Sequence, residues 1–149
     1  MKITLVEGDI TTQEVDAVVN AANSRMRGGG GVDGAIHRAG GPAVLEDCKR
    51  RFPDGLATGD AGWTTAGEMP AQWVIHVVGP NYRAGQSDRS LLTSCYARAL
   101  EVADELGART VELVEASYRS VVSGRAEPVA SPARPTLAAP ARAGRSAGG

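Results

Sequence analysis

Four consecutive glycines at residues 28–31 constrain this chain more than any other feature. The sequence continues through Val32, Asp33 and Gly34 into a helical pattern at residues 35–39. A chain tolerates the entropy cost of such glycines where its backbone must approach another group closely or adopt positive φ. A glycine-rich loop that opens a helix presents free N–H groups and the positive end of the helix dipole. The pattern therefore predicts a loop that binds an anion such as a phosphate.

Residues 29–34 also match GxGxxG, the fingerprint of dinucleotide-binding proteins. In that fold the glycines follow the strand directly, whereas here seven residues separate the apolar run at 15–20 from Gly28. The carboxylate of Asp33 would repel a pyrophosphate lying on the loop, and it fits better beside ribose hydroxyls or a reacting water. A flexible surface linker is the remaining alternative. It is disfavoured because linkers rarely lead from an apolar strand through paired asparagines into a helix.

The pattern of apolar residues predicts strands and helices that alternate along the chain. Residues 15–20 are apolar on both sides, as in a central strand covered on both faces. The predicted strands are residues 3–6, 15–20, 59–67 and 73–78, and the predicted helices begin at Asp33 and Pro42 and span residues 90–106, with Gly107 at the C′ position. This order predicts an α/β sheet with helices on its faces.

Several polar residues stand where such a sheet binds ligands. Asn20 and Asn23 follow the central strand at its carboxyl end, and amides suit the recognition of sugar hydroxyls. Both could instead tie down the loop through Asx-type bonds. Asp33 and His37 are four residues apart and share a helix face, although a structural role for His37 is the simpler interpretation. Asp9 follows a strand, where an aspartate often only caps a turn.

Composition and charge exclude several classes of protein. The net charge is -1 and the pI about 6.1, so nucleic acid is not expected as a partner. The sequence contains no apolar run long enough to span a membrane and no signal peptide, so we expect a cytoplasmic protein without a membrane partner. Nothing in the composition predicts the oligomeric state.

No metal or cofactor is expected from the cysteines and histidines. Cys48 and Cys95 lie far apart without CxxC spacing, which favours two buried free thiols. His37 and His76 are the only histidines and are scattered in the sequence. His76 lies inside an apolar run, where we expect a core imidazole with satisfied hydrogen bonds.

Four motifs together resemble the macro domain family. They are GDIT at residues 8–11, VDAVVNAAN at 15–23, GGGGVDGAIHRAGG at 28–41 and VIHVVGP at 74–80. The resemblance is to the branch of ADP-ribose-binding hydrolases that includes O-acetyl-ADP-ribose deacetylases and mono-ADP-ribosyl hydrolases. It covers residues 1–111 and implies a mixed sheet flanked by helices that is C-terminally incomplete.

The resemblance implies hydrolysis of an ester at the distal ribose of ADP-ribose, without a cofactor. The substrate would be O-acetyl-ADP-ribose or a protein ADP-ribosylated on an acidic side chain. The implied catalytic residues are Asp33, which orients or deprotonates a water, and Asn23, which holds the distal ribose. The candidate substrate-binding residues are Asp9 and Ile10 at the adenine, together with Asn20, Gly30, Gly31, Val32 and His37.

The resemblance fails after the predicted strand at residues 109–111. The family pattern continues with a second glycine loop that closes over the pyrophosphate, and no such loop follows here. Residues 112–149 form a non-matching tail that is predicted to be largely disordered, because from Ser123 onward it consists mainly of Ala, Arg, Pro, Ser and Gly. Two alternatives to an active hydrolase therefore remain: a module that binds ADP-ribose without turnover, and an inactive truncated fragment.

Overall fold

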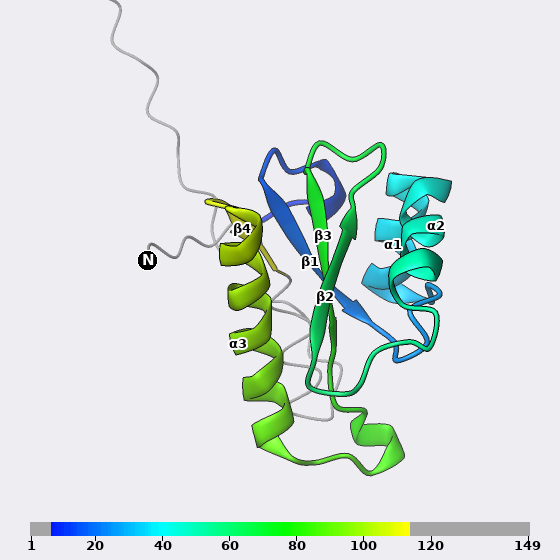
Figure 1. Ribbon diagram of the computed structural model, residues 1–149, viewed down its shortest axis with the longest axis vertical. Helices are drawn as coiled ribbons and strands as arrows, with labels where there is room; N and C mark the ends of the chain where they lie inside the picture. The colour runs from blue at the N-terminus through cyan, green and yellow to red at the C-terminus, as the bar shows by residue number, and fades with distance from the viewer. Residues whose placement is uncertain (1–6, 114–149) are drawn as a thin grey trace, which may run out of the picture.

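The computed structural model describes residues 7–113, which form a mixed four-stranded sheet with helices on both faces (Figure 1). The elements are η1 (Ile10–Thr12), β1 (Ala17–Ala22), α1 (Gly31–Gly40), α2 (Pro42–Arg51), β2 (Ala61–Thr65), β3 (Trp73–Val78), η2 (Tyr82–Ala84), α3 (Arg89–Leu106) and β4 (Val111–Glu112). The strand order is β2-β3-β1-β4. β1 pairs in parallel with β3 and β4, and β2 pairs antiparallel with β3. The predicted α/β fold is confirmed.

Two predictions concern residues that lie outside the described range. These are the strand at residues 3–6 and the disordered tail, of which only residues 112 and 113 are described. Among the helices that are described, none combines the length and the apolar character needed to cross a bilayer.

Alternation along the strands divides the core into two layers. Val18 and Val74 face α1 and pack in a cluster with Ile36. Ala17 and Ile75 face the opposite side, where they pack against Ala99, Val102 and Ala103 of α3. Figure 1 shows the result, with α1 and α2 on one side of the sheet and α3 on the other. Because the period of a strand is two, Asn20 and His76 project into the α1 layer with Val18 and Val74.

The helix termini follow the predicted glycine and proline signals. α1 begins at Gly31, two residues before the predicted start, so Asp33 lies in the first turn. Gly41 has a φ of 72° and separates α1 from α2, which begins with Pro42. α3 ends at Gly107, whose left-handed conformation gives the predicted C′ geometry.

α3 carries more apolar residues than it buries. The buried residues are Cys95, Ala99, Val102 and Ala103, and these mostly small side chains let the helix lie close to the sheet. Leu100 is also apolar, but it is 45% exposed and lies outside this contact.

Candidate active site

Asn20 and His76 form a buried polar group beneath α1. They are opposite each other in the parallel pairing of β1 with β3. Asn20 is 0% exposed and His76 is 1% exposed. The amide nitrogen of Asn20 lies 3.0 Å from His76 Nδ1 and donates a hydrogen bond of 2.7 Å to Asp33 Oδ1. The sheet therefore contacts the carboxylate of α1 through polar atoms.

Asp33 points inward, toward the glycine loop. Its residue is 5% exposed, and Oδ1 also lies 3.5 Å from His37 Nε2, one turn along α1. A Cβ built on Gly29 would lie 3.1 Å from Asp33 Oδ2 and 3.4 Å from Asn23 Nδ2. Oδ2 and the Asn23 amide therefore both lie beside Gly29, and the two predicted catalytic groups are neighbours.

Asn23 closes the loop on itself. Its amide nitrogen donates to the carbonyl of Gly28 at 2.8 Å, and its side-chain oxygen accepts from the N–H of Arg25 at 3.1 Å. These are the Asx-type contacts that the sequence left open as an alternative. The side chain is exposed, and each amide nitrogen carries two hydrogens, so one N–H is left for a ligand. The catalytic role of Asn23 stays a prediction.

The glycines at the start of α1 are open to solvent. Gly30 and Gly31 are exposed, and a Cβ on either would meet no heavy atom within 4 Å. The N–H groups of a first helical turn have no acceptor within the helix. Val32 is half-buried and packs against the core layer under α1. This geometry suits an anion at the helix N-terminus, and contact of these residues with substrate stays a prediction.

Asp9 is the N-cap of the short helix η1, and Ile10 is the first residue of that helix. Asp9 Oδ1 accepts hydrogen bonds from the N–H and the hydroxyl of Thr11, at 2.9 and 2.7 Å, and these bonds lower the pKa of Asp9. Asp9 is exposed, whereas Ile10 is buried in the same cluster as Ile36 of α1. The carboxylate thus acts as a helix cap in this structure, and the predicted contact of both residues with adenine is untested.

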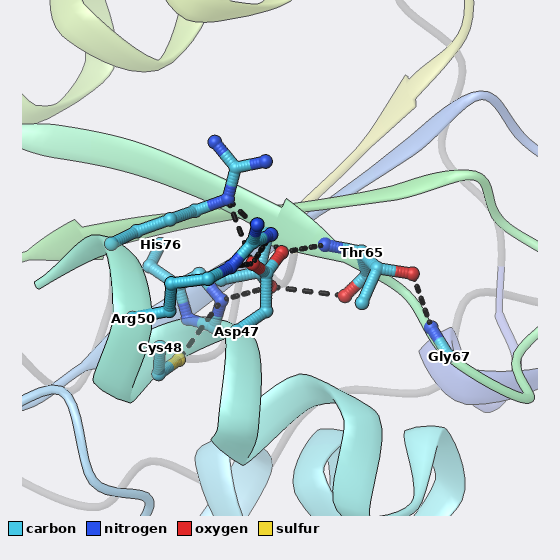
Figure 2. A network of polar contacts seen from close by, with 8 residues as sticks. Asp47, Cys48, Arg50, Thr65, Gly67 and His76 are labelled. Carbon is cyan, nitrogen blue, oxygen red and sulfur yellow. Dashed lines mark hydrogen bonds and ion pairs between the residues drawn. The ribbon is translucent and has the colours of Figure 1, made fainter.

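Two further side chains contact His76, both at its Nε2 atom. Its Nε2 lies 2.8 Å from Thr64 Oγ1 and 3.8 Å from Cys48 Sγ. Figure 2 shows Cys48 beside His76. The hydroxyl of Thr64 donates to the carbonyl of Thr65, so it accepts from His76 Nε2–H. Burial lowers the pKa of His76 to about 3, so the ring is neutral. The prediction of a satisfied core imidazole is confirmed.

The network continues to α2 through Asp47. Its carboxylate accepts hydrogen bonds from Arg50 and Arg51 and, at 2.9 Å, from the N–H of Thr65 (Figure 2). Burial opposes ionisation of Asp47, but these bonds outweigh it and lower the pKa of the carboxyl group. Asp47 therefore anchors α2 to the strand that carries Thr64.

Three potential metal ligands converge, contrary to the interpretation of the histidines as scattered. The ligating atoms of His37, Cys48 and His76 lie within 4.8 Å of one another because α1, α2 and β3 meet here. Both ring nitrogens of His76 already have hydrogen-bond partners. Burial, with smaller effects of the Asp33 and Asp47 charges, raises the pKa of the Cys48 thiol to about 11. Cys48 and His76 are therefore neutral and contact each other, rather than standing free as metal ligands.

The sequence did not reveal that Thr64 and Cys48 support the site. A buried threonine and a buried cysteine carry no signal of their own, because both occur in ordinary cores. The detectable signal was His76 on the same strand face as Val74 and Val78, combined with Asn20 on a strand expected to be central. Only the register of β1 against β3 shows that these two residues lie opposite each other and are in contact.

Comparison with known proteins identifies the family. The macro domain model matches residues 19–121. A macro domain-containing protein of Streptomyces coelicolor, SCO6450, is 60% identical over 113 residues, which are 73% of this chain and 67% of that protein. O-acetyl-ADP-ribose deacetylase 1 of Pantoea vagans is 50% identical over 113 residues, covering 74% of this chain and 66% of the relative.

A solved structure agrees with the sequence comparison. The Trypanosoma brucei macrodomain in complex with ADP-ribose superposes with a TM-score of 0.63 at 35% identity, over 78% of this chain and 52% of that chain. The chain belongs to the macro domain family. It spans about two thirds of the length of the curated relatives described above and about half of the trypanosomal one.

The burial of neutral His76 predicts a loss of stability in acid. The pKa of His76 is about 3 in the folded chain and about 6.5 in an unfolded one, so below pH 6.5 only the unfolded chain gains the proton. The contribution of His76 to the free energy of unfolding is therefore complete above pH 6.5. It falls by about 1.4 kcal/mol for each pH unit below that, which is a loss of about 2 kcal/mol at pH 5. Urea unfolding at pH 7 and pH 5 measures this change, which a His76→Phe variant should lack. An equal loss in both proteins would contradict the assignment.

Proposed function

We propose that this chain is a hydrolase that removes an ester-linked group from the distal ribose of ADP-ribose. The substrate is O-acetyl-ADP-ribose or a mono-ADP-ribosylated aspartate or glutamate side chain. The observation that carries the proposal is the inward carboxylate of Asp33, with one oxygen bonded to Asn20 and the other directed toward Gly29 and the Asn23 amide. The deacetylase name of the Pantoea vagans relative supports the same chemistry.

In the proposed reaction, Asp33 acts on a water molecule. Oδ2 orients that water and accepts its proton as the water oxygen attacks the ester carbonyl carbon. The bond between that carbon and the ribose oxygen then breaks, the ribose oxygen takes the proton from Asp33 and becomes a hydroxyl, and the carboxylic acid leaves. The Asn23 amide holds the distal ribose so that this carbon faces the water. A carboxylate contributes little to the simple binding of a diphosphate, because like charges repel, so its position beside the loop favours catalysis over binding alone.

The rest of the ligand follows the open start of α1. The N–H groups of Gly30, Gly31 and Val32 contact the phosphates, and the positive end of the helix dipole strengthens these bonds. Asp9 and Ile10 contact the adenine at the other end of the ligand. His37 borders the ribose end, since it lies within 3.5 Å of the Asp33 carboxylate.

A module that binds ADP-ribose without turnover is the second candidate. It is favoured by the contacts of Asn23, whose amide oxygen and one amide hydrogen are committed to the loop.

One experiment separates the two functions. The 149-residue chain is incubated with O-acetyl-ADP-ribose while acetate release is followed, and ADP-ribose binding is measured in parallel by calorimetry. We expect both binding and acetate release. Binding without release would establish a binding module, and the absence of both would refute an ADP-ribose site in this chain.

A further inference from the structure

The buried Asn20 amide is fixed in one orientation. Its nitrogen is within hydrogen-bond distance of both Asp33 Oδ1 and His76 Nδ1. Its oxygen is buried and has no hydrogen-bond partner among the residues that the structure describes. A rotated amide would place that oxygen against a carboxylate oxygen and a ring nitrogen, both of which need a donor. In this orientation the amide nitrogen donates two hydrogen bonds, and the amide oxygen has no donor among the described residues.

The hydrogen bonds around His76 form a chain with a single direction. The hydroxyl of Thr64 has a carbonyl acceptor in Thr65, so it receives the proton of His76 Nε2. A neutral imidazole with its proton on Nε2 is an acceptor at Nδ1. Nδ1 then takes one N–H of Asn20 and leaves the other N–H for the Asp33 carboxylate. Each hydrogen bond therefore determines which atom donates in the next one, along the path from β2 to α1.

We propose that His76 and Thr64 are positioning residues, which hold the Asn20 amide as a donor to Asp33 and so keep one carboxylate oxygen fixed and the other free to act. This inference rests on the proposed hydrolase function. Neither His76 nor Thr64 touches substrate, because both are buried beneath α1. Asn20, the residue between them and Asp33, is likewise too buried to leave the network for a ligand.

Two matched substitutions on β2 test the chain of bonds. Thr64→Val removes the acceptor of His76, whereas Thr65→Val removes only a hydroxyl that accepts from the N–H of Gly67. We expect Thr64→Val to lower kcat about 10- to 100-fold, the range for a small misplacement of a catalytic group. The KM and the ADP-ribose affinity should stay within about twofold, since the phosphate contacts lie elsewhere. Thr65→Val should keep its kcat, and equal kcat values in the two variants would overturn the proposal.

A pair of substitutions at His76 separates positioning from stability. His76→Asn retains an acceptor at the place of Nδ1, and His76→Phe fills the volume without one. We expect His76→Asn to keep the higher kcat even where its melting temperature is the lower of the two. If kcat instead follows the melting temperature in both variants, His76 has only a structural role and the inference fails.

A measurement without substrate keeps the two proposals distinguishable. Nitrogen-15 NMR of the labelled chain reports the tautomer of His76, and we expect a neutral ring with the proton on Nε2 between pH 5 and 8. A proton on Nδ1, or a ring that titrates in this range, would overturn the chain of bonds. Lack of turnover in the unaltered protein would refute the proposed function, while the NMR result would still support or overturn the hydrogen-bond chain.

Discussion

Replacing Asp33 with alanine should slow ester hydrolysis by about 10²- to 10⁴-fold, the usual contribution of a positioned general base. The substitution removes the group that accepts the proton of the attacking water. It leaves the open glycines at the start of α1 unchanged, so ADP-ribose should bind as well as before or more tightly, because a negative charge near the diphosphate is lost. Single-turnover acetate release and calorimetry measure the two effects.

A matched control uses an acidic residue far from the loop. Glu105→Ala, on the exposed side of α3, removes the same charge and should leave the rate of hydrolysis unchanged. A rate for Asp33→Ala within a few fold of the unaltered chain would exclude Asp33 as the base. It would transfer the chemistry to another group, such as a substrate phosphate.

Replacing Gly67 with alanine should destabilise the fold by about 3–5 kcal/mol, the range of the largest single-site effects. Gly67 has a φ of 60°, and a Cβ there would lie 1.9 Å from the carbonyl oxygen of Gly40. That carbonyl also accepts from the N–H of Glu68 at 3.0 Å, so the turn after β2 is fastened to the last residue of α1. Relief of the collision requires backbone movement. Urea unfolding measures the loss.

Gly85→Ala is the matched control for this substitution. Gly85 also has a positive φ, of 83°, but a Cβ on it would meet no heavy atom within 4 Å. The Gly85→Ala variant should lose only about 1–2 kcal/mol of unfolding free energy, the cost of placing alanine in the left-handed conformation. Equal losses in the two variants would show that backbone conformation alone, and not the contact with α1, sets the requirement for glycine at position 67.

The sequence was sufficient to predict the layers of the fold and the position of the carboxylate. Apolar runs covered on both sides identified the paired strands β1 and β3, and Gly107 marked the end of α3. The spacing of four between Asp33 and His37 placed them on one helix face, and the structure brings Asp33 Oδ1 within 3.5 Å of His37 Nε2. These features are local, so periodicity and capping residues were enough to predict them.

The support behind the carboxylate could not be predicted in this way. Asn20 was expected to reach substrate, yet it is buried and bonded to His76, 56 positions away. That contact depends on the register of β1 against β3, and a shift of one residue would turn either side chain to the α3 layer. Periodicity gives the faces of a strand but not the residue opposite each position.

Because Gly29 has no side chain, space remains between the side chains of Asp33 and Asn23. The point where a Cβ would stand is nearly equidistant from Asp33 Oδ2 and Asn23 Nδ2, at 3.1 and 3.4 Å. A water molecule at such a point could donate to the carboxylate and accept from the amide, and a methyl group there would exclude it. Glycine at position 29 thus leaves space between the Asp33 carboxylate and the Asn23 amide, which any other residue would fill with a side chain.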